Sequence, residues 1–307
     1  MAIIIALGFI GNMVQANSVA DAFQTAFGVP VWLTGIVLFA LAGFIFIGGI
    51  RRIASFAEKM VPIMALVYII GSLTIIVGHG DMFWGALKSI IVGAFDPVAA
   101  TGGVIGAGVK EAIRYGVARG LFSNEAGMGS IPNAAATADA THPVKQGLVQ
   151  AAGVYVDTLF VCTASAMLVL LTPGWQESGL TGIELSQHVL SSQLGEWTNI
   201  FMTVIVLFFA FSSIIGNYFY GEVNMDFISR RPAALQIFRA LVVCMVFFGS
   251  VASLGLVWNL ADLFMALMAI LNIVAILMLG RIAFLVLDDY FAQKRAGIAQ
   301  PEFDPCI

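Results

Sequence analysis

The densest group of residues suited to binding a ligand lies between Arg119 and Asn133. This stretch reads Arg-Gly-Leu-Phe-Ser-Asn-Glu-Ala-Gly-Met-Gly-Ser-Ile-Pro-Asn. Glycine weakens a helix and proline cannot continue one, so Gly127, Gly129 and Pro132 together predict a break in a helix. A break frees backbone N–H groups that can hold a carboxylate, and carbonyl groups that can hold an amine or a cation. The expected chemistry is therefore the binding of a zwitterion such as an amino acid.

Two features of this stretch have an alternative interpretation. The glycines also suit close helix packing, as in small-xxx-small contacts, but packing does not explain why Ser123, Asn124 and Ser130 interleave with them. Glu125 is either a structural carboxylate that caps free N–H groups and pairs with an arginine such as Arg119, or a group that takes part in ion coupling.

The composition indicates the solvent in which these residues work. Of 307 residues, 60% are hydrophobic and only 10% are charged, and the mean hydropathy is +0.97. A water-soluble domain uses about a quarter charged residues, so lipid must be the solvent of this chain. Cys162, Cys244 and Cys306 show neither paired nor metal-ligand spacing and are interpreted as packing residues.

Apolar runs of about 17 to 25 residues recur along the chain, and each is long enough to cross a bilayer as a helix. We expect about eight such segments, at 3–17, 30–49, 60–78, 104–138 (the interrupted one), 147–172, 197–221, 234–251 and 257–280. Residues 1–280 are thus expected to form one transmembrane domain. Residues 281–307 are expected to form an amphipathic helix on the cytoplasmic membrane surface, followed by a frayed tail.

The basic residues of the connecting segments recur in every second loop. They are Arg51, Arg52, Lys59, Lys145, Arg230, Arg231, Arg281, Lys294 and Arg295. By the positive-inside rule these loops face the cytoplasm, and the intervening loops 79–97 and 173–196, which are mostly acidic, face outward. The chain is therefore expected to be a multi-pass protein of the inner (cytoplasmic) cell membrane.

The stretch from Gly120 to Ser130, with Arg119 before it and 134–138 after it, resembles the signature of the alanine or glycine:cation symporter family, also called the sodium:alanine symporter family. Further stretches resemble the same family along nearly the whole chain. They are Gly11–Ser18, Tyr155–Thr158 with Cys162 and Thr163, Phe211–Tyr218 and Val257–Asp262. The resemblance implies sodium-coupled symport of small neutral amino acids such as alanine or glycine.

The resemblance also implies an all-α, LeuT-type bundle built from two inverted five-helix repeats, each of which begins with a broken helix. By matching segments, 1–78 is the remainder of the first repeat and 104–280 is the second. Because 3–17 matches a third helix, the first two core helices are expected to be missing and the chain to be N-terminally truncated. An inactive fragment of such a carrier is then an alternative.

The resemblance implies a substrate site built around the break. Its expected residues there are Phe122, Ser123, Asn124, Gly127, Gly129 and Ser130. Gln15 is added because an uncharged amide in an apolar helix can bind a carboxylate or amine, although it also suits a hydrogen bond between helices. Trp258 and Asn259, at the outer end of the last apolar helix, are expected to close the site, although tryptophan is also ordinary at a membrane interface.

A sodium ion prefers oxygen ligands, and three residues at membrane depth offer them. Ser212 and Ser213 stand in the middle of an apolar run, where the resemblance implies a sodium site; back-bonding to their own helix is the alternative. Asp157 is a carboxylate deep in a membrane segment, either an ion ligand or one half of a structural pair. The expected partners are a small neutral amino acid, sodium as coupling ion and membrane lipid, with no other cofactor and no nucleic acid.

Other classes of function are less well supported by the residues. An intramembrane enzyme needs a nucleophile with a base, or a metal set, yet no HExxH-type pair occurs and His79, His142 and His188 all fall in loops. A channel would be separated from a carrier by its kinetics. Proton coupling through Asp157 or Glu125 remains an alternative to sodium coupling.

Overall fold

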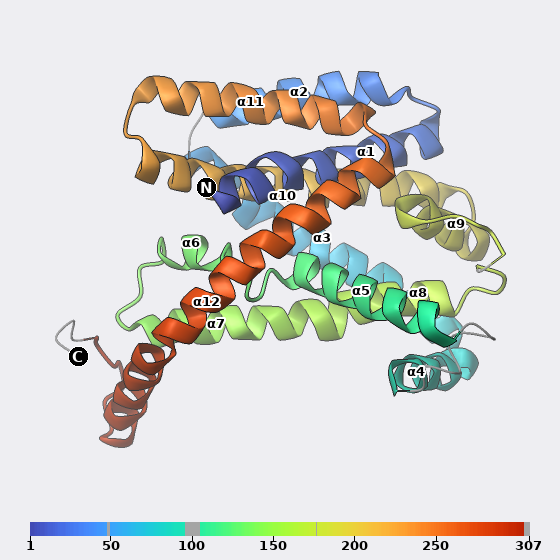
Figure 1. Ribbon diagram of the computed structural model, residues 1–307. Coiled ribbons are helices and arrows are strands. Elements are labelled where there is room, and N and C mark those ends of the chain that lie inside the picture. The colour runs from blue at the N-terminus through green and yellow to red at the C-terminus, as the bar shows by residue number, and fades with distance from the viewer. Residues whose placement is uncertain (48–49, 96–104, 176, 304–307) are drawn as a thin grey trace.

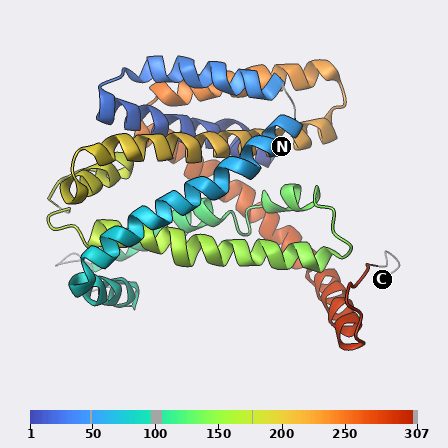
Figure 2. The same cartoon turned by 180° about the vertical axis from the view of Figure 1, so that it is seen from behind.

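A computed structural model describes residues 1–47, 50–95, 105–175 and 177–303 of the chain. The regular elements in these ranges are all helical, and the ranges contain no strand. Figure 1 shows the helices in superposed layers, and Figure 2 shows the same layers from behind. The expected all-α class is therefore confirmed.

One part of the molecule is a tightly packed group of helices that share a single apolar core. They are η1 (Ile4–Gly11), which has π-helical turns, α1 (Asn12–Phe27), α2 (Val31–Ile47), α10 (Trp197–Ile228) and α11 (Pro232–Val251). In Figure 1 α2 and α11 lie side by side above α1 and α10. Met13, Tyr218 and Val246 are fully buried between these layers, so this group, the packed part, forms the scaffold.

The second part is more loosely packed. It consists of α3 (Ile50–Gly78), α4 (Gly80–Phe95), α5 (Ile105–Asn124), α6 (Ile131–Ala135), α7 (Pro143–Val156), the π-helical η2 (Asp157–Cys162) and α8 (Thr163–Leu170). Helix α12 (Leu254–Arg295) starts beside the packed part and runs diagonally across to α7 (Figure 1). It therefore links the two parts.

Four of the described helical segments are long and apolar enough to cross a membrane. They are Pro143–Leu170, Trp197–Ile228, Pro232–Val251 and Leu254–Arg295. A fifth span arises if Ala65–Gly78 and Gly80–Val92, which are bent by 106° at a short break, are counted as one. A multi-pass membrane protein is confirmed, but the expected number of about eight spans is not. Counted as one span, the bent pair would be a second broken helix, where only one was expected.

Two helices lie in segments that were expected to be outward-facing loops. Helix α4 falls within 79–97, and α9 (Gly182–Leu194) falls within 173–196. The two helices lie at the right-hand end of Figure 1, whereas the α6–α7 and α10–α11 connections lie at the opposite end. These two connections, which carry or adjoin basic residues, thus lie at the opposite end of the bundle from α4 and α9. Which end faces the cytoplasm stays a prediction from the charge pattern.

The end of the chain differs from the expectation. Residues 281–295 do not form a separate surface helix, because they continue α12 without interruption. The tail is not frayed up to Phe303, since the N–H of Phe303 donates to the carbonyl of Thr141 at 2.9 Å. The mixture of polar and apolar residues in 281–295 suggested a surface helix. The structure of the tail is instead determined by its contact with Thr141.

Candidate functional site

The predicted break is present between α5 and α6. Helix α5 ends at Asn124, and α6 begins at Ile131. Between them Glu125, Gly127 and Gly129 adopt left-handed backbone conformations with φ of 52°, 81° and 94°, and such conformations favour glycine. The second half-helix is only five residues long, much shorter than the interrupted segment 104–138 suggested.

Side chains from neighbouring elements support the broken backbone. The Asn272 amide of α12 donates to the carbonyl of Gly127 at 2.8 Å. A Cβ atom at Gly129 would lie 3.1 Å from the same Asn272 side chain, so a larger residue would displace it. The Asn133 amide donates to the carbonyl of Gly129 at 3.0 Å. Ser130 is fully buried, and its hydroxyl has no hydrogen-bond partner among the described residues.

A cavity of about 270 Å³ lies directly beside the break. Its lining consists of Leu7, Gln15, Phe122, Ser123, Glu125, Met128, Ser213, Asn217 and Met265. Four of the residues predicted from the sequence, Gln15, Phe122, Ser123 and Ser213, thus meet in one small cavity, although they come from α1, α5 and α10. The rest of the lining joins apolar walls to a carboxyl group and an amide.

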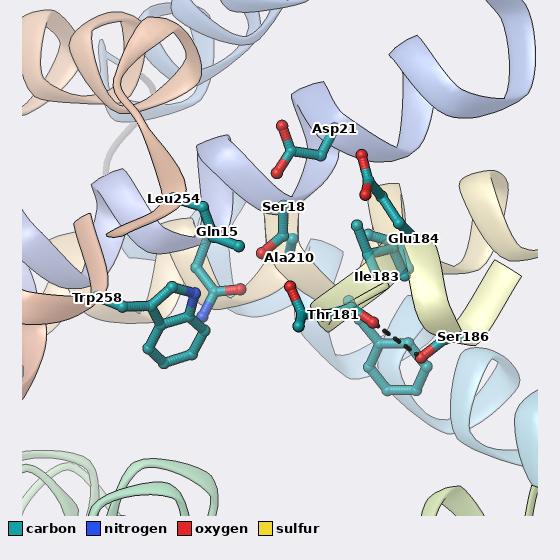
Figure 3. Close-up of a pocket in the computed structure, with 13 residues that line it drawn as sticks. Gln15, Ser18, Asp21, Thr181, Ile183, Glu184, Ser186, Ala210, Leu254 and Trp258 are labelled. Carbon is teal, nitrogen blue, oxygen red and sulfur yellow. Dashed lines mark hydrogen bonds between the residues drawn. The ribbon is translucent and has the colours of Figure 1, made fainter. Parts of the chain in front are cut away.

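A larger cavity of about 540 Å³ lies on the side where α9 packs. Figure 3 shows Gln15 and Trp258 on one side of it and Asp21 and Glu184 on the other. Asp21 lies beyond the expected membrane segment 3–17. Burial, with a further contribution from the nearby Glu184, raises the pKa of the Asp21 carboxyl above its ordinary value. Gln15 lines both cavities, so its side chain lies between them.

Two aromatic rings separate the two cavities. Phe122 lines the small cavity and Trp258 the large one, with their ring centroids 5.1 Å apart. The Arg119 guanidinium lies 4.0 Å from the centroid of the Trp258 ring and pairs with Asp262 at 2.7 Å. Arg119 therefore braces the ring pair by a cation–π contact and an ion pair. It does not form the pair with Glu125 that was one interpretation of the sequence.

A network of polar side chains joins the end of α5 to η2. The Ser123 hydroxyl donates to the Asp157 carboxylate at 2.7 Å, and the Thr158 hydroxyl donates to the Asn124 amide oxygen at 2.8 Å. The wide turns of η2 carry both Asp157 and Thr158, and π-helical turns of this kind occur frequently at functional sites. Asp157 is thus positioned within one hydrogen bond of the small cavity.

Two predicted residues lie elsewhere. The Ser212 hydroxyl donates to the carbonyl of Phe209 at 2.8 Å, which is the back-bonding considered from the sequence. Asn259 is exposed and lies outside the linings of the two cavities described above. Asn217 and Asn272 were not predicted from the sequence. Each is an amide within an apolar run, which is the same signal that selected Gln15.

Comparison with known proteins gives one consistent result. A family described as the sodium:alanine symporter family matches residues 1–305. The probable sodium/glutamine symporter GlnT of Bacillus subtilis is 45% identical over 96% of this chain and 61% of its own length. In the same organism, the amino-acid carrier protein AlsT is 40% identical over 96% of this chain and 62% of its own length. The putative sodium/proton-dependent alanine carrier protein YrbD, also from Bacillus subtilis, is 39% identical over 99% of this chain and 65% of its own length.

The chain therefore spans slightly less than two thirds of the length of these relatives. The match extends over nearly the whole of this chain, including the break and both cavities.

Proposed function

Because the chain belongs to the sodium:alanine symporter family, we propose that it forms the core of a carrier that moves a small neutral amino acid together with sodium across the cell membrane. The observation that carries the proposal is the small cavity beside the break. There, left-handed backbone and the side chains of Gln15, Ser123 and Ser213 offer both donors and acceptors to one ligand.

Both ends of an amino-acid zwitterion have partners at this position. The Gln15 amide, which lines the cavity, suits the carboxylate. Backbone N–H groups of the adjoining break, near Gly129 and Ser130, are proposed as further donors. The carbonyl groups at the end of α5 suit the ammonium group. The apolar walls formed by Phe122, Met128 and Met265 face the substrate side chain.

The size of the cavity favours a small substrate. Its volume of about 270 Å³ is below the range of roughly 300–1,000 Å³ that holds drug-sized ligands. An amino acid is well below drug size and fits such a volume. The Phe122–Trp258 ring pair is then the outer closure of the site, and Asn259 at the same end of α12 stays a predicted contributor.

The sodium ion would bind next to the substrate. The Ser213 hydroxyl lines the cavity, and the Asp157 carboxylate reaches it through Ser123. These are hard oxygen ligands of the kind that sodium prefers. Ser212, one residue away on α10, stays a predicted ligand through its lone pairs, but a weaker one than Ser213 because its hydroxyl donates within its own helix.

Proton coupling is the second candidate, and one observation favours it. The Glu125 carboxyl group lines the small cavity, and the relative YrbD is described as sodium/proton-dependent. A carboxyl group at this position can bind a proton during the cycle in place of a cation.

The LeuT-type arrangement of inverted repeats, with 1–78 in the first and 104–280 in the second, is also part of the proposal. It is supported by the helix break at the start of the second repeat. The full-length protein is the right material for functional tests, because the relatives are longer than the region that they share with this chain.

Uptake into liposomes tests the proposed function directly. The purified full-length protein is expected to accumulate labelled alanine or glycine when sodium is high outside, and to lose this uptake when choline replaces sodium at constant pH. Equal uptake in choline would exclude sodium coupling. Uptake that instead follows an imposed pH gradient would favour proton coupling. Competition by excess glutamine, compared with excess alanine, measures the size preference.

A further inference from the structure

The last described residues of the chain lie against the loop that precedes α7. We call residues 296–303 the strap. The Thr141 hydroxyl donates to the carbonyl of Pro301 at 3.0 Å, and the N–H of Phe303 donates to the carbonyl of Thr141 at 2.9 Å. Pro301 is buried in this contact. The strap therefore joins two segments that are about 160 positions apart in the sequence.

His142 is the centre of this contact, and its side chain is fully buried. One ring nitrogen accepts a hydrogen bond from the N–H of Val144 at 3.2 Å, and the other lies 3.2 Å from the Asp289 carboxylate of α12. The ring also packs between Tyr290 of α12 and Phe303 of the strap, with centroid distances of 5.0 and 5.6 Å. His142 thus contacts α7, α12 and the strap at once.

Gln293 fixes the strap to α12. Its amide nitrogen donates to the Asp289 carboxylate and to the carbonyl of Glu302, each at 2.8 Å. Its amide oxygen accepts from the N–H of Glu302 at 3.0 Å. The Lys294 ammonium donates to the carbonyl of Ala299 at 2.8 Å. The strap is therefore held at its beginning and near its end.

The position of the strap connects it to the site. The loop that it holds, 136–142, directly follows α6, the second half of the broken helix. The other anchor is α12, which carries Asn272 against the break and Trp258 at the outer closure. The strap lies at the end of the bundle where the basic loops are found, away from the large outer cavity (Figure 1).

The strap is suited to opening and closing. It has no regular secondary structure beyond the last turn of α12, most of its residues are exposed, and it is fixed mainly by hydrogen bonds. Segments with few buried apolar contacts open at a much lower free-energy cost than packed helices do. A closed strap restrains the α6–α7 loop without blocking the cavity itself.

We propose that the strap is a latch at the cytoplasmic end, which holds the broken helix against α12 and must release when the site opens on that side. The proposal rests on the proposed function, because it assigns the latch to one step of a transport cycle. It assigns to His142, Gln293 and the strap a role that is separate from ligand binding.

Cross-linking the strap tests the need for release. In full-length protein whose native cysteines are replaced by serine, Thr141→Cys and Phe303→Cys are expected to cross-link through a short thiol-reactive linker. The closed cross-link should lower alanine uptake at least about fivefold, reversibly on cleavage of the linker, while alanine binding in detergent stays unchanged. Uptake that is equal before and after cross-linking would overturn the latch.

A matched pair in the packed part is the control for cross-linking. A Cβ atom on Gly43 of α2 would lie 3.9 Å from the Val243 side chain of α11, so Gly43→Cys with Val243→Cys should cross-link without changing uptake. If the protein takes up no alanine even without a linker, the proposed transport function fails, and the strap is then judged by the next measurement alone.

Hydrogen exchange tests the strap contact without any transport assay. Ending the chain after Arg295 should increase the amide exchange rate of residues 141–145 at least about tenfold, whereas removing only 304–307 should leave it unchanged. Exchange at the same rate in the protein with and without the strap would show that the strap does not restrain this loop, and the latch would be rejected.

Discussion

The packed part and the broken part of the molecule use glycine in opposite ways. In the packed part a Cβ atom on Gly249 would lie 2.4 Å from the Cα of Met13, and one on Gly221 would lie 2.5 Å from the Phe238 ring. At the break Gly127 has open space around it but a φ of +81°. One set of glycines lets helices approach each other, and the other lets the backbone leave the helix.

Polar side chains show the same contrast. In the packed part the Asn17 amide donates to the carbonyls of Gly249 and Ala252 at 3.1 and 2.9 Å, where it caps the end of α11. Near the break, the Ser123 hydroxyl donates to Asp157 and the Thr158 hydroxyl donates to Asn124, and Ser123, Asn124 and Asp157 line a cavity. Polar groups that complete a helix end stabilise the scaffold, whereas polar groups that face a cavity remain available to a ligand.

The largest effect, a loss of thermal stability, is expected for a substitution in the packed part. Gly249→Ala forces the new methyl group into the backbone of α1, so α1 and α11 must separate. Overpacking of this kind costs about 3 kcal/mol, and thermal unfolding in detergent should shift to a clearly lower temperature. Gly216→Ala in α10 is the control, because no atom lies within 4 Å of the added Cβ. Equal stability of the two variants would contradict the packing role.

The next largest effect is expected at the carboxylate beside the break. Asp157→Asn keeps the shape of the side chain that accepts the Ser123 hydroxyl, but it removes the charge proposed to bind sodium. The sodium concentration for half-maximal uptake should rise at least about tenfold, or about 1.4 kcal/mol. The thermal stability should change little. Unchanged sodium dependence would make Asp157 a structural residue.

Gly127→Ala separates backbone conformation from packing. The new methyl group meets no atom within 4 Å, but the left-handed conformation is unfavourable for alanine, at a cost of about 1 kcal/mol. A moderate loss of alanine affinity, about fivefold, should accompany a small loss of stability. Gly129→Ala is a less clean test, because its methyl group would also contact Asn272. Normal affinity in Gly127→Ala would weaken the assignment of the break to the site.

Local sequence signals predicted the features that depend on local chemistry. The break at 125–130 follows from two glycines and a proline within six residues, because these residues act on their own backbone. The membrane class follows from hydropathy in the same way, and the sidedness of the loops stays a prediction from their charge. Gln15 and Ser213 were singled out because a polar group within an apolar run is costly unless it has a partner, and both line the small cavity.

Features that depend on partners distant in the sequence were not predicted. Helix α9 has no long apolar run, and it is held by Gln187, whose amide donates to the carbonyl of Ala22 at 3.2 Å and to the Thr203 hydroxyl at 2.9 Å. The pairing of Arg119 with Asp262 spans 143 positions, so the nearer Glu125 was an equally reasonable partner. The strap likewise depends on Thr141 and His142, which no local pattern connects to the end of the chain.

The smallest effect on sodium dependence is expected for one of two adjacent serines on α10. This helix belongs to the packed part but borders the small cavity. The Ser212 hydroxyl already donates to its own helix, whereas Ser213 lines the cavity beside Gln15. Ser212→Ala should therefore change the sodium dependence of uptake by less than about twofold, and Ser213→Ala should change it more. This difference would show that Ser213 belongs to the site and that the adjacent Ser212 belongs to the packed part. If Ser212→Ala had the larger effect, Ser212 would belong to the ion site, and the hydrogen bond to its own helix would not explain its role.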